Sequence, residues 1–467
     1  MTLTTTTSRP SQRLSNNSVK FDETMNTSEV SVPSASNMVE DAPPKTNLFL
    51  ADMKVGILTH HWLYNFGANL QALATVSCLR KLGYKPVILN YRIPELVAKY
   101  DAMVTNEQRM AHVDFCNKYL PESEICTDTQ TVVQVAKQCQ LGAVVSGSDA
   151  VLRIDPRSNR DDLGFPNPFW LNWTEHAGIN RSGFLATSAM GSNFWDIRRQ
   201  QRIEMGRATD QLSYIGVRDR WTERMLRLCH GTKTINYCPD PVSVFNDDVD
   251  IDSEAPSNDN YILFSGYKKT VSKDWIKEFV RAANEKGFRV FSLPHPELVV
   301  DGSFDQVLKL PMSPIQWWNW LKHSKGYVGV RFHPIMISLV NGTPFVSLDQ
   351  YQTGLRFKNR FLTKAALPLR PWFSWLSKTY DIATRSDKVQ YCLNPRQYKK
   401  KSGKDIFELL HSQMDSSQQN EFVNSTKTIF RSTLQKICGG APFLQPKSKS
   451  FPKLFLPNAQ HSVAVHD

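Results

Sequence analysis

An arginine and a histidine stand together in the tripeptide Arg331-Phe332-His333, which closes the short apolar segment 326–330. A second apolar segment follows, so the pattern predicts a strand, a turn and a helix over 334–341 that begins at Pro334. In an open α/β sheet, ligands bind outside the carboxyl ends of strands. A guanidinium offers a fork for carboxylate or phosphate, and an imidazole exchanges a proton near neutral pH. The tripeptide therefore predicts chemistry on a small anion. An exposed arginine beside a structural histidine is the alternative.

A second arginine occupies a similar place earlier in the chain. Arg218 directly follows the predicted strand 214–217 and precedes Asp219. A surface ion pair between this aspartate and Arg220 or Arg224 is the structural alternative. However, two arginines at facing strand ends, one from each half of the chain, would grip a doubly charged anion such as a phosphorylated carboxylate.

A turn rich in amide side chains follows the first predicted strand. Asn65 and Asn69 flank Gly67 at the start of the predicted helix 68–82. The glycine permits a close backbone approach, and the two amides have the chemistry to bind sugar hydroxyls. The spacing is not G-x-G-x-x-G, so it does not predict a dinucleotide site. A simple asparagine cap on the helix remains the alternative.

Another polar turn, Gly147-Ser148-Asp149, ends the predicted buried strand 141–146. Its hydroxyl and carboxylate are suited to accept or donate hydrogen bonds at a sugar, and the aspartate is a candidate base. An N-cap is again the structural alternative, because aspartate is common in that position.

Metal and redox chemistry find little support in the sequence. His60-His61 lacks the further ligands that a metal motif such as H-E-x-x-H supplies. The eight cysteines are scattered without a C-x-x-C pair, which argues against a zinc site or a disulfide scaffold. We expect no metal, no cofactor and a reducing, cytoplasmic compartment.

The elements that position these residues alternate between strand and helix. This pattern predicts an α/β fold with two Rossmann-like domains that face a cleft. The segment 247–260 is acidic, polar and contains a proline, as in an interdomain linker. The expected organisation is a disordered leader (1–50), a first domain (51–246), the linker (247–260), a second domain with C-terminal helices (261–440) and a flexible tail (441–467).

The charge of the chain points to an anionic partner. The formal net charge is +12, which favours phosphate-bearing substrates, acidic polymers or peripheral contact with an anionic membrane surface. The sequence contains no nucleic-acid recognition motif, so we expect no nucleic-acid partner. No apolar segment approaches the ~18 residues that a transmembrane helix needs.

In this order, the motifs resemble the polysaccharide pyruvyl transferase family. The likeness extends over about residues 53–350 and depends on five elements in register. They are Tyr64-Asn65-Phe66-Gly67-Ala68-Asn69-Leu70-Gln71-Ala72, Gly147-Ser148-Asp149, Thr187-Ser188-Ala189-Met190-Gly191, Val217-Arg218-Asp219 with Asp240-Pro241, and Arg331-Phe332-His333.

The resemblance implies a GT-B-like fold and transfer of pyruvate from phosphoenolpyruvate to a hydroxyl pair of a glycan or lipid-linked sugar, forming a ketal. It implies that Arg218, Arg331 and Phe332 bind phosphoenolpyruvate. His333 would be the acid or a phosphate ligand, and Asp149 a weaker candidate base. The sugar acceptor would contact Asn65, Gly67, Asn69 and Ser148.

The sequence leaves two alternatives open. A nucleotide-sugar glycosyltransferase on the same fold would bind a nucleoside diphosphate in the second domain. A non-catalytic carbohydrate-binding relative would have Arg218 or His333 pointing away from the cleft. Arg356 and Arg360 are further candidate contacts for an acidic glycan.

Overall fold

The computed structural model describes residues 52–158, 160–190, 192, 196–251, 254–266, 270–294, 303–349, 377–414 and 421–440. These residues belong to one compact unit, 47–467. The predicted leader 1–50 and tail 441–467 lie outside the described residues. None of the helices in the described ranges combines the length and the apolarity that crossing a bilayer requires.

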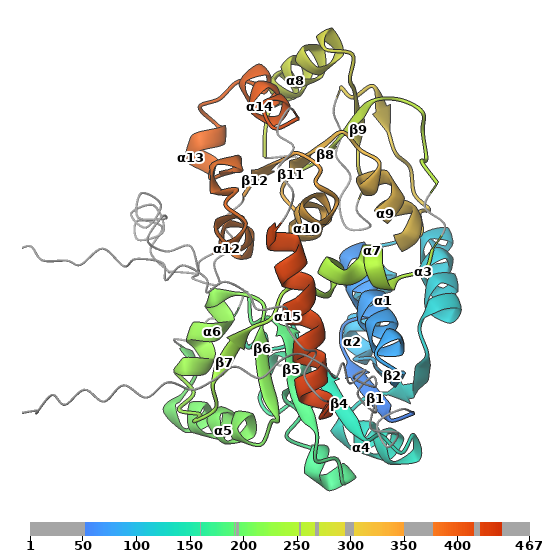
Figure 1. Ribbon diagram of the computed structural model, residues 1–467, viewed down its shortest axis with the longest axis vertical. Coiled ribbons are helices and arrows are strands. Elements are labelled where there is room, and N and C mark those ends of the chain that lie inside the picture. The colour runs from blue at the N-terminus through green and yellow to red at the C-terminus, as the bar shows by residue number, and fades with distance from the viewer. Residues whose placement is uncertain are drawn as a thin grey trace, which may run out of the picture. The chain divides into compact units, whose positions relative to one another are not determined.

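The first half of the described chain forms a seven-stranded parallel sheet in the order β3-β2-β1-β4-β5-β6-β7 (Figure 1). Its central strands are almost wholly buried, because helices cover both faces of a parallel sheet. The strands are β1 Lys54–Leu58, β2 Lys85–Tyr91, β3 Glu122–Cys126, β4 Ala143–Ser146, β5 Ser182–Thr187, β6 Tyr214–Val217 and β7 Ile235–Tyr237.

The second half forms a six-stranded parallel sheet in the order β10-β9-β8-β11-β12-β13. Its strands are β8 Tyr261–Ser265, β9 Arg289–Ser292, β10 Gln306–Val307, β11 Gly326–Gly329, β12 Phe345–Leu348 and β13 Cys392–Leu393. Two parallel α/β sheets confirm the predicted fold of two Rossmann-like domains, as in the GT-B class.

Helices connect the strands in both sheets. In the first half they are α1 Phe66–Lys81, α2 Pro94–Asp101, α3 Asn106–Tyr119, α4 Thr129–Gln138, α5 Arg199–Asp210, α6 Arg220–Arg227 and α7 Phe245–Asp248, with 3-10 turns at Asp161–Leu163, Pro168–Trp170, Thr174–Ala177 and Pro241–Val244. In the second half they are α8 Lys273–Glu285, α9 Pro314–Lys322, α10 Phe332–Asn341, α12 Lys378–Arg385, α13 Pro395–Tyr398, α14 Gly403–His411 and α15 Glu421–Cys438, with a 3-10 turn at Val389–Tyr391.

Helix α1 lies where the two halves meet. It is buried along nearly its whole length, as a helix is when it packs between two layers. It contacts α7 and α9, and the Phe66 ring lies 5.3 Å from the Trp317 ring. Trp317 and Trp318 are each 1 % exposed, whereas Trp320 is only partly buried, so two tryptophans of α9 fill the core. This packing brings α10 of the second half close to the start of α1.

The last described helix, α15, packs against the first sheet, although its sequence position suggested the second domain. Figure 1 shows it crossing in front of β4 and β5, and it contacts β4, β5 and β6. Asp247 and Asp248 receive ion pairs from Arg431 at 3.2 and 2.7 Å, and Asp247 also pairs with Lys427 at 2.8 Å. Part of the predicted linker is therefore an acidic anchor for a basic helix face, because opposite charges attract across this contact.

Helix α10 begins at Phe332, so the predicted start at Pro334 is wrong. Arg331 is the N-cap, and the proline occupies the third helical position. Proline is tolerated there, because the first-turn N–H groups have no partner within the helix. His333 consequently belongs to the first turn of α10, and its direction is fixed by the helix axis.

Candidate active site

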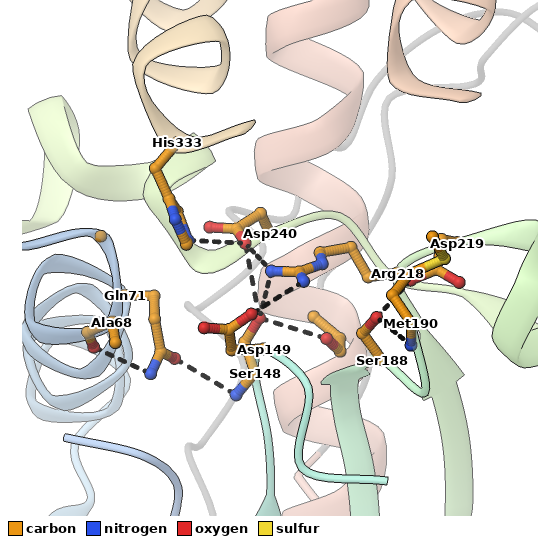
Figure 2. Close-up of polar contacts among 12 residues, drawn as sticks. Ala68, Gln71, Ser148, Asp149, Ser188, Met190, Arg218, Asp219, Asp240 and His333 are labelled. Carbon is orange, nitrogen blue, oxygen red and sulfur yellow. Dashed lines mark hydrogen bonds and ion pairs between the residues drawn. The ribbon is translucent and has the colours of Figure 1, made fainter. Parts of the chain in front are cut away.

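The strand ends of the first sheet meet at Arg218, which the sequence placed after β6. Its side chain is 3 % exposed. It donates from Nη1 to Asp240 Oδ2 at 2.7 Å and from Nη2 to Asp149 Oδ1 at 3.1 Å (Figure 2). Burial alone would lower the pKa of Arg218, but the two carboxylates outweigh it and raise the pKa. The predicted strand-end arginine is thus present, but two aspartates share its guanidinium.

Asp149 lies at the centre of the site in a left-handed backbone conformation, with φ of 70°. Aspartate tolerates this region better than most residues. Burial would raise the pKa of its carboxyl, but Arg218 and Lys378 outweigh that effect and keep the pKa well below its usual range. Asp149 is therefore an ionised carboxylate, which suits a counter-charge better than a strong base.

Ser148 and the residue before it are fixed by the sheet. The Ser148 hydroxyl donates to Ala186 O at 3.1 Å, and its backbone N–H donates to Gln71 Oε1 at 3.2 Å. A side chain at Gly147, whose φ is 132°, would collide with the carbonyl of Leu185. Only glycine therefore fits at position 147, two residues before the carboxylate of Asp149.

His333 reaches this cluster from the second half of the chain. Figure 2 shows its imidazole pointing at Asp240, with Nε2 3.7 Å from Oδ2. Burial lowers the pKa of His333 to about 4, against the opposing effect of the Asp240 and Asp149 carboxylates. The imidazole is therefore neutral at pH 7. A non-catalytic relative would have His333 or Arg218 turned away, whereas both lie in one cluster.

The Asn65–Asn69 turn shapes the site through structure. Asn65 caps α1, accepting from the N–H groups of Gly67 and Ala68 at 3.1 and 3.4 Å. Asn69 is fully buried and its Nδ2 donates to His61 O. A Cβ built on Gly67 would collide with the His333 imidazole. The structure thus gives these residues capping and packing roles, and their contact with a sugar stays a prediction.

A small pocket opens beside the cluster on the side of α10. Its lining includes one residue of the first half and, in the second, residues that follow β11 and β12 or stand at the starts of α10 and α12: Met190, Val330, Arg331, Phe332, Asp349, Ser377, Lys378 and Thr379. The side chain of the N-cap residue Arg331 makes no capping hydrogen bond to α10, whose positive dipole end lies at this pocket. Two predicted residues, Arg331 and Phe332, therefore line a pocket that suits an anion.

Lys378 is a pocket residue that the sequence did not reveal. Its Nζ lies 5.1 Å from the centre of the Phe332 ring, and Arg218 Cζ lies 4.7 Å from the same ring. Burial lowers the pKa of Lys378, an effect that the nearby Asp149 opposes. No sequence motif includes this lysine. It belongs to α12, which is far along the chain from Arg331 and reaches the pocket only in the folded protein. Arg356, Arg360 and Gly191 lie outside the described residues.

The buried histidines make stability depend on pH. Burial lowers the pKa of both His112 and His333 to about 4. Between pH 6.5 and 4 the unfolded chain binds more protons than the folded one, so the free energy of unfolding decreases as the pH falls through this window. Each histidine contributes up to ~3 kcal/mol to the free energy of unfolding, which is fully present above pH 6.5 and is lost as the pH falls toward 4. We expect the free energy of unfolding of His112→Phe, measured by urea unfolding at several pH values, to depend less steeply on pH than that of the wild type.

The exposed His176 provides the matched control for this measurement. His176→Phe should keep the wild-type slope, because its imidazole remains in water in the folded protein. An unchanged slope in His112→Phe would show that His112 protonates equally in the folded and unfolded chain.

Comparisons with solved structures give only distant resemblances. A putative UDP-N-acetylglucosamine 2-epimerase from Listeria monocytogenes is 11% identical with a TM-score of 0.45, covering 84% of this chain and 98% of the other. Arabidopsis thaliana UGT89C1 in complex with quercetin is 10% identical with a TM-score of 0.41, covering 83% and 98%. A search of the curated proteins gives no match.

The sequence comparison with protein families is more decisive. A family model described as polysaccharide pyruvyl transferase matches residues 65–350, which span α1, both polar strand ends of the first sheet and the Arg331 motif. These elements build the cluster and the part of the pocket lining that precedes α12. The chain therefore belongs to the polysaccharide pyruvyl transferase family.

Proposed function

We propose that the protein transfers pyruvate from phosphoenolpyruvate to a hydroxyl pair of a glycan or lipid-linked sugar, forming a cyclic ketal. One observation carries the proposal. The pocket at the start of α10 is lined by two cationic side chains, Arg331 and Lys378, and Lys378 is close enough to interact electrostatically with both the His333 imidazole and the Asp149 carboxylate. Phosphoenolpyruvate carries a carboxylate and a phosphate close together, and it needs such paired cations.

The donor contacts follow from the charges. Arg331 offers a planar fork, and Lys378 offers a mobile point charge. Arg218 already neutralises Asp240 and Asp149, so it mainly holds the cluster together. Its Nε donates to neither carboxylate and remains a donor for a direct contact with phosphoenolpyruvate. The Phe332 ring lies 4.7 Å from Arg218 Cζ and 5.1 Å from Lys378 Nζ, so both cations contact the same aromatic side chain.

The reaction balances as two additions at one carbon. A proton moves to the methylene carbon of phosphoenolpyruvate, and the first sugar hydroxyl adds to C2 and loses its proton. The C2–O bond to phosphate then breaks, and the second hydroxyl adds to the same carbon. Of the two hydroxyl protons released, one balances the new methyl group and the other leaves with phosphate. The family and the site both support this chemistry.

His333 is the proposed proton carrier. Its pKa is about 4 in the unliganded protein, so the imidazole must gain a proton before it acts as an acid. A bound phosphate near Nε2 would raise that pKa, because an adjacent negative charge favours the imidazolium. Substrate binding and activation of the acid are thereby coupled. The alternative role, in which the imidazole only binds phosphate, uses the same position.

Calorimetric titration tests the donor. Phosphoenolpyruvate should bind without any added nucleotide. UDP-sugars should give no heat above the buffer control. Binding of a UDP-sugar without binding of phosphoenolpyruvate would overturn the proposal and favour a nucleotide-sugar glycosyltransferase. Binding of neither donor, together with binding of a glycan, would favour a carbohydrate-binding relative.

A further inference from the structure

Helix α12 connects the pocket at the start of α10, here called the donor pocket, to the first half of the chain. Its first residue is Lys378, which lines the pocket, and Asp381 follows one helical turn later. Ser377, the N-cap of α12, donates its hydroxyl to Asp349 Oδ2 at 2.7 Å, immediately after β12. The start of the helix is therefore tied to the second sheet, and the next turn extends toward the first.

Asp381 contacts α6, the helix that follows Arg218 and Asp219. Its carboxylate is 2 % exposed. Oδ2 accepts from the backbone N–H of Arg220 at 3.0 Å, and Oδ1 lies 3.3 Å from Arg220 Nε. A backbone donor in the first turn of α6 has no partner within its own helix. The contact therefore joins α12 to a main-chain position that is set by the strand end carrying Arg218.

A second arginine strengthens the same contact. Arg385 Nε lies 3.3 Å from Asp381 Oδ1, and its guanidinium carbon lies 4.0 Å from the centre of the Tyr237 ring on β7. One carboxylate thus stands between two guanidinium groups. Without its charge, Arg220 and Arg385 would repel each other across the boundary between α6 and α12.

We propose that Asp381 is a positioning residue that holds the Lys378 ammonium in the donor pocket by docking α12 onto α6. This inference rests on the proposed function of the pocket. A lysine side chain has several rotatable bonds and loses much rotamer freedom when it is held. The orientation of α12 therefore decides whether the ammonium reaches a bound anion. Asp381 acts through Lys378 and does not itself contact the substrate.

Steady-state kinetics in a double-mutant cycle test the inference. Lys378→Met and Asp381→Asn should each raise the KM for phosphoenolpyruvate about tenfold, with kcat of Asp381→Asn changed less than about twofold. The double variant should match Lys378→Met alone, because the lost contact acts through the same ammonium. Glu223→Gln, which breaks an exposed pair with Arg227 on α6, is the control and should keep the wild-type KM.

A chemical readout separates this inference from the proposed function. Reductive methylation of Lys378, followed by mass spectrometry of the peptide, should be at least about fivefold faster in Asp381→Asn than in wild type, since the released ammonium enters water. This result supports the positioning role even if wild type ignores phosphoenolpyruvate, which would overturn only the proposed donor. An unchanged methylation rate, or KM effects that multiply in the double variant, would overturn the positioning role.

Discussion

Arg331→Ala is expected to abolish the thermal stabilisation that phosphoenolpyruvate gives to the wild-type protein. Arg331 lines the pocket at the N-cap of α10, where its fork and the helix dipole act on the same anion. A ligand at a hundredfold its Kd stabilises by about 2.7 kcal/mol, and a hundredfold loss of affinity leaves about 0.4 kcal/mol. Differential scanning fluorimetry with and without phosphoenolpyruvate measures this difference.

Arg289→Ala is the matched control, because Arg289 belongs to the second sheet but pairs with Asp259 on the exposed surface. It should keep the wild-type ligand-induced shift. An undiminished shift in Arg331→Ala would show that phosphoenolpyruvate binds elsewhere. Comparing the ligand-induced change, and not the absolute Tm, separates lost binding from any loss of intrinsic stability.

Gly67→Ala is expected to lower kcat by at least about a hundredfold while α1 still forms. The added methyl group would collide with the His333 imidazole, which sits directly against the first turn of α1. Overpacking of this kind costs about 1–3 kcal/mol of stability, and small displacements of a proton-transfer group cost far more in rate. Alanine is otherwise favourable within a helix, so the collision is the cause.

His333→Ala provides the complementary variant. It removes the imidazole that the new methyl group would meet, so Gly67→Ala should cost little stability in the His333→Ala background. Urea unfolding of the four proteins measures this coupling. Equal destabilisation by Gly67→Ala in both backgrounds would contradict the steric account and place the effect in α1 itself.

The sequence predicted much of the fold because parallel strands buried on both faces leave short apolar segments. The strand Tyr214–Val217 matches its predicted bounds, and the strand predicted over 141–146 ends at the same residue, Ser146. Strand β3, Glu122–Cys126, escaped prediction because it lies at the sheet edge and its side chains are mostly polar and exposed. An exposed strand lacks the run of apolar residues that burial requires, so its sequence does not reveal it.

Site residues that follow a strand could be predicted from the sequence. Residues whose role depends on contacts between distant segments could not. Arg218 and Asp149 each follow a strand of the first sheet, so their convergence followed from its parallel topology, and Arg331 was recognisable because it follows a strand of the second sheet. That Gly67 would make room for His333 depends on how the two halves pack, whereas Asp240, which shares Arg218, follows the neighbouring strand β7 of the same sheet. Lys378 depends on a helix that docks from a distant part of the chain.

Phosphoenolpyruvate labelled with ¹⁸O in the oxygen that bridges C2 and phosphorus tests the central claim most directly. The purified protein is incubated with this donor and a mixture of glycan acceptors, and both products are analysed by mass spectrometry. We predict inorganic phosphate that carries the label, together with glycans that have gained one pyruvyl ketal, because the C2–O bond breaks. Unlabelled phosphate with labelled pyruvate, or sugar transfer from a nucleotide sugar with phosphoenolpyruvate unused, would contradict the account.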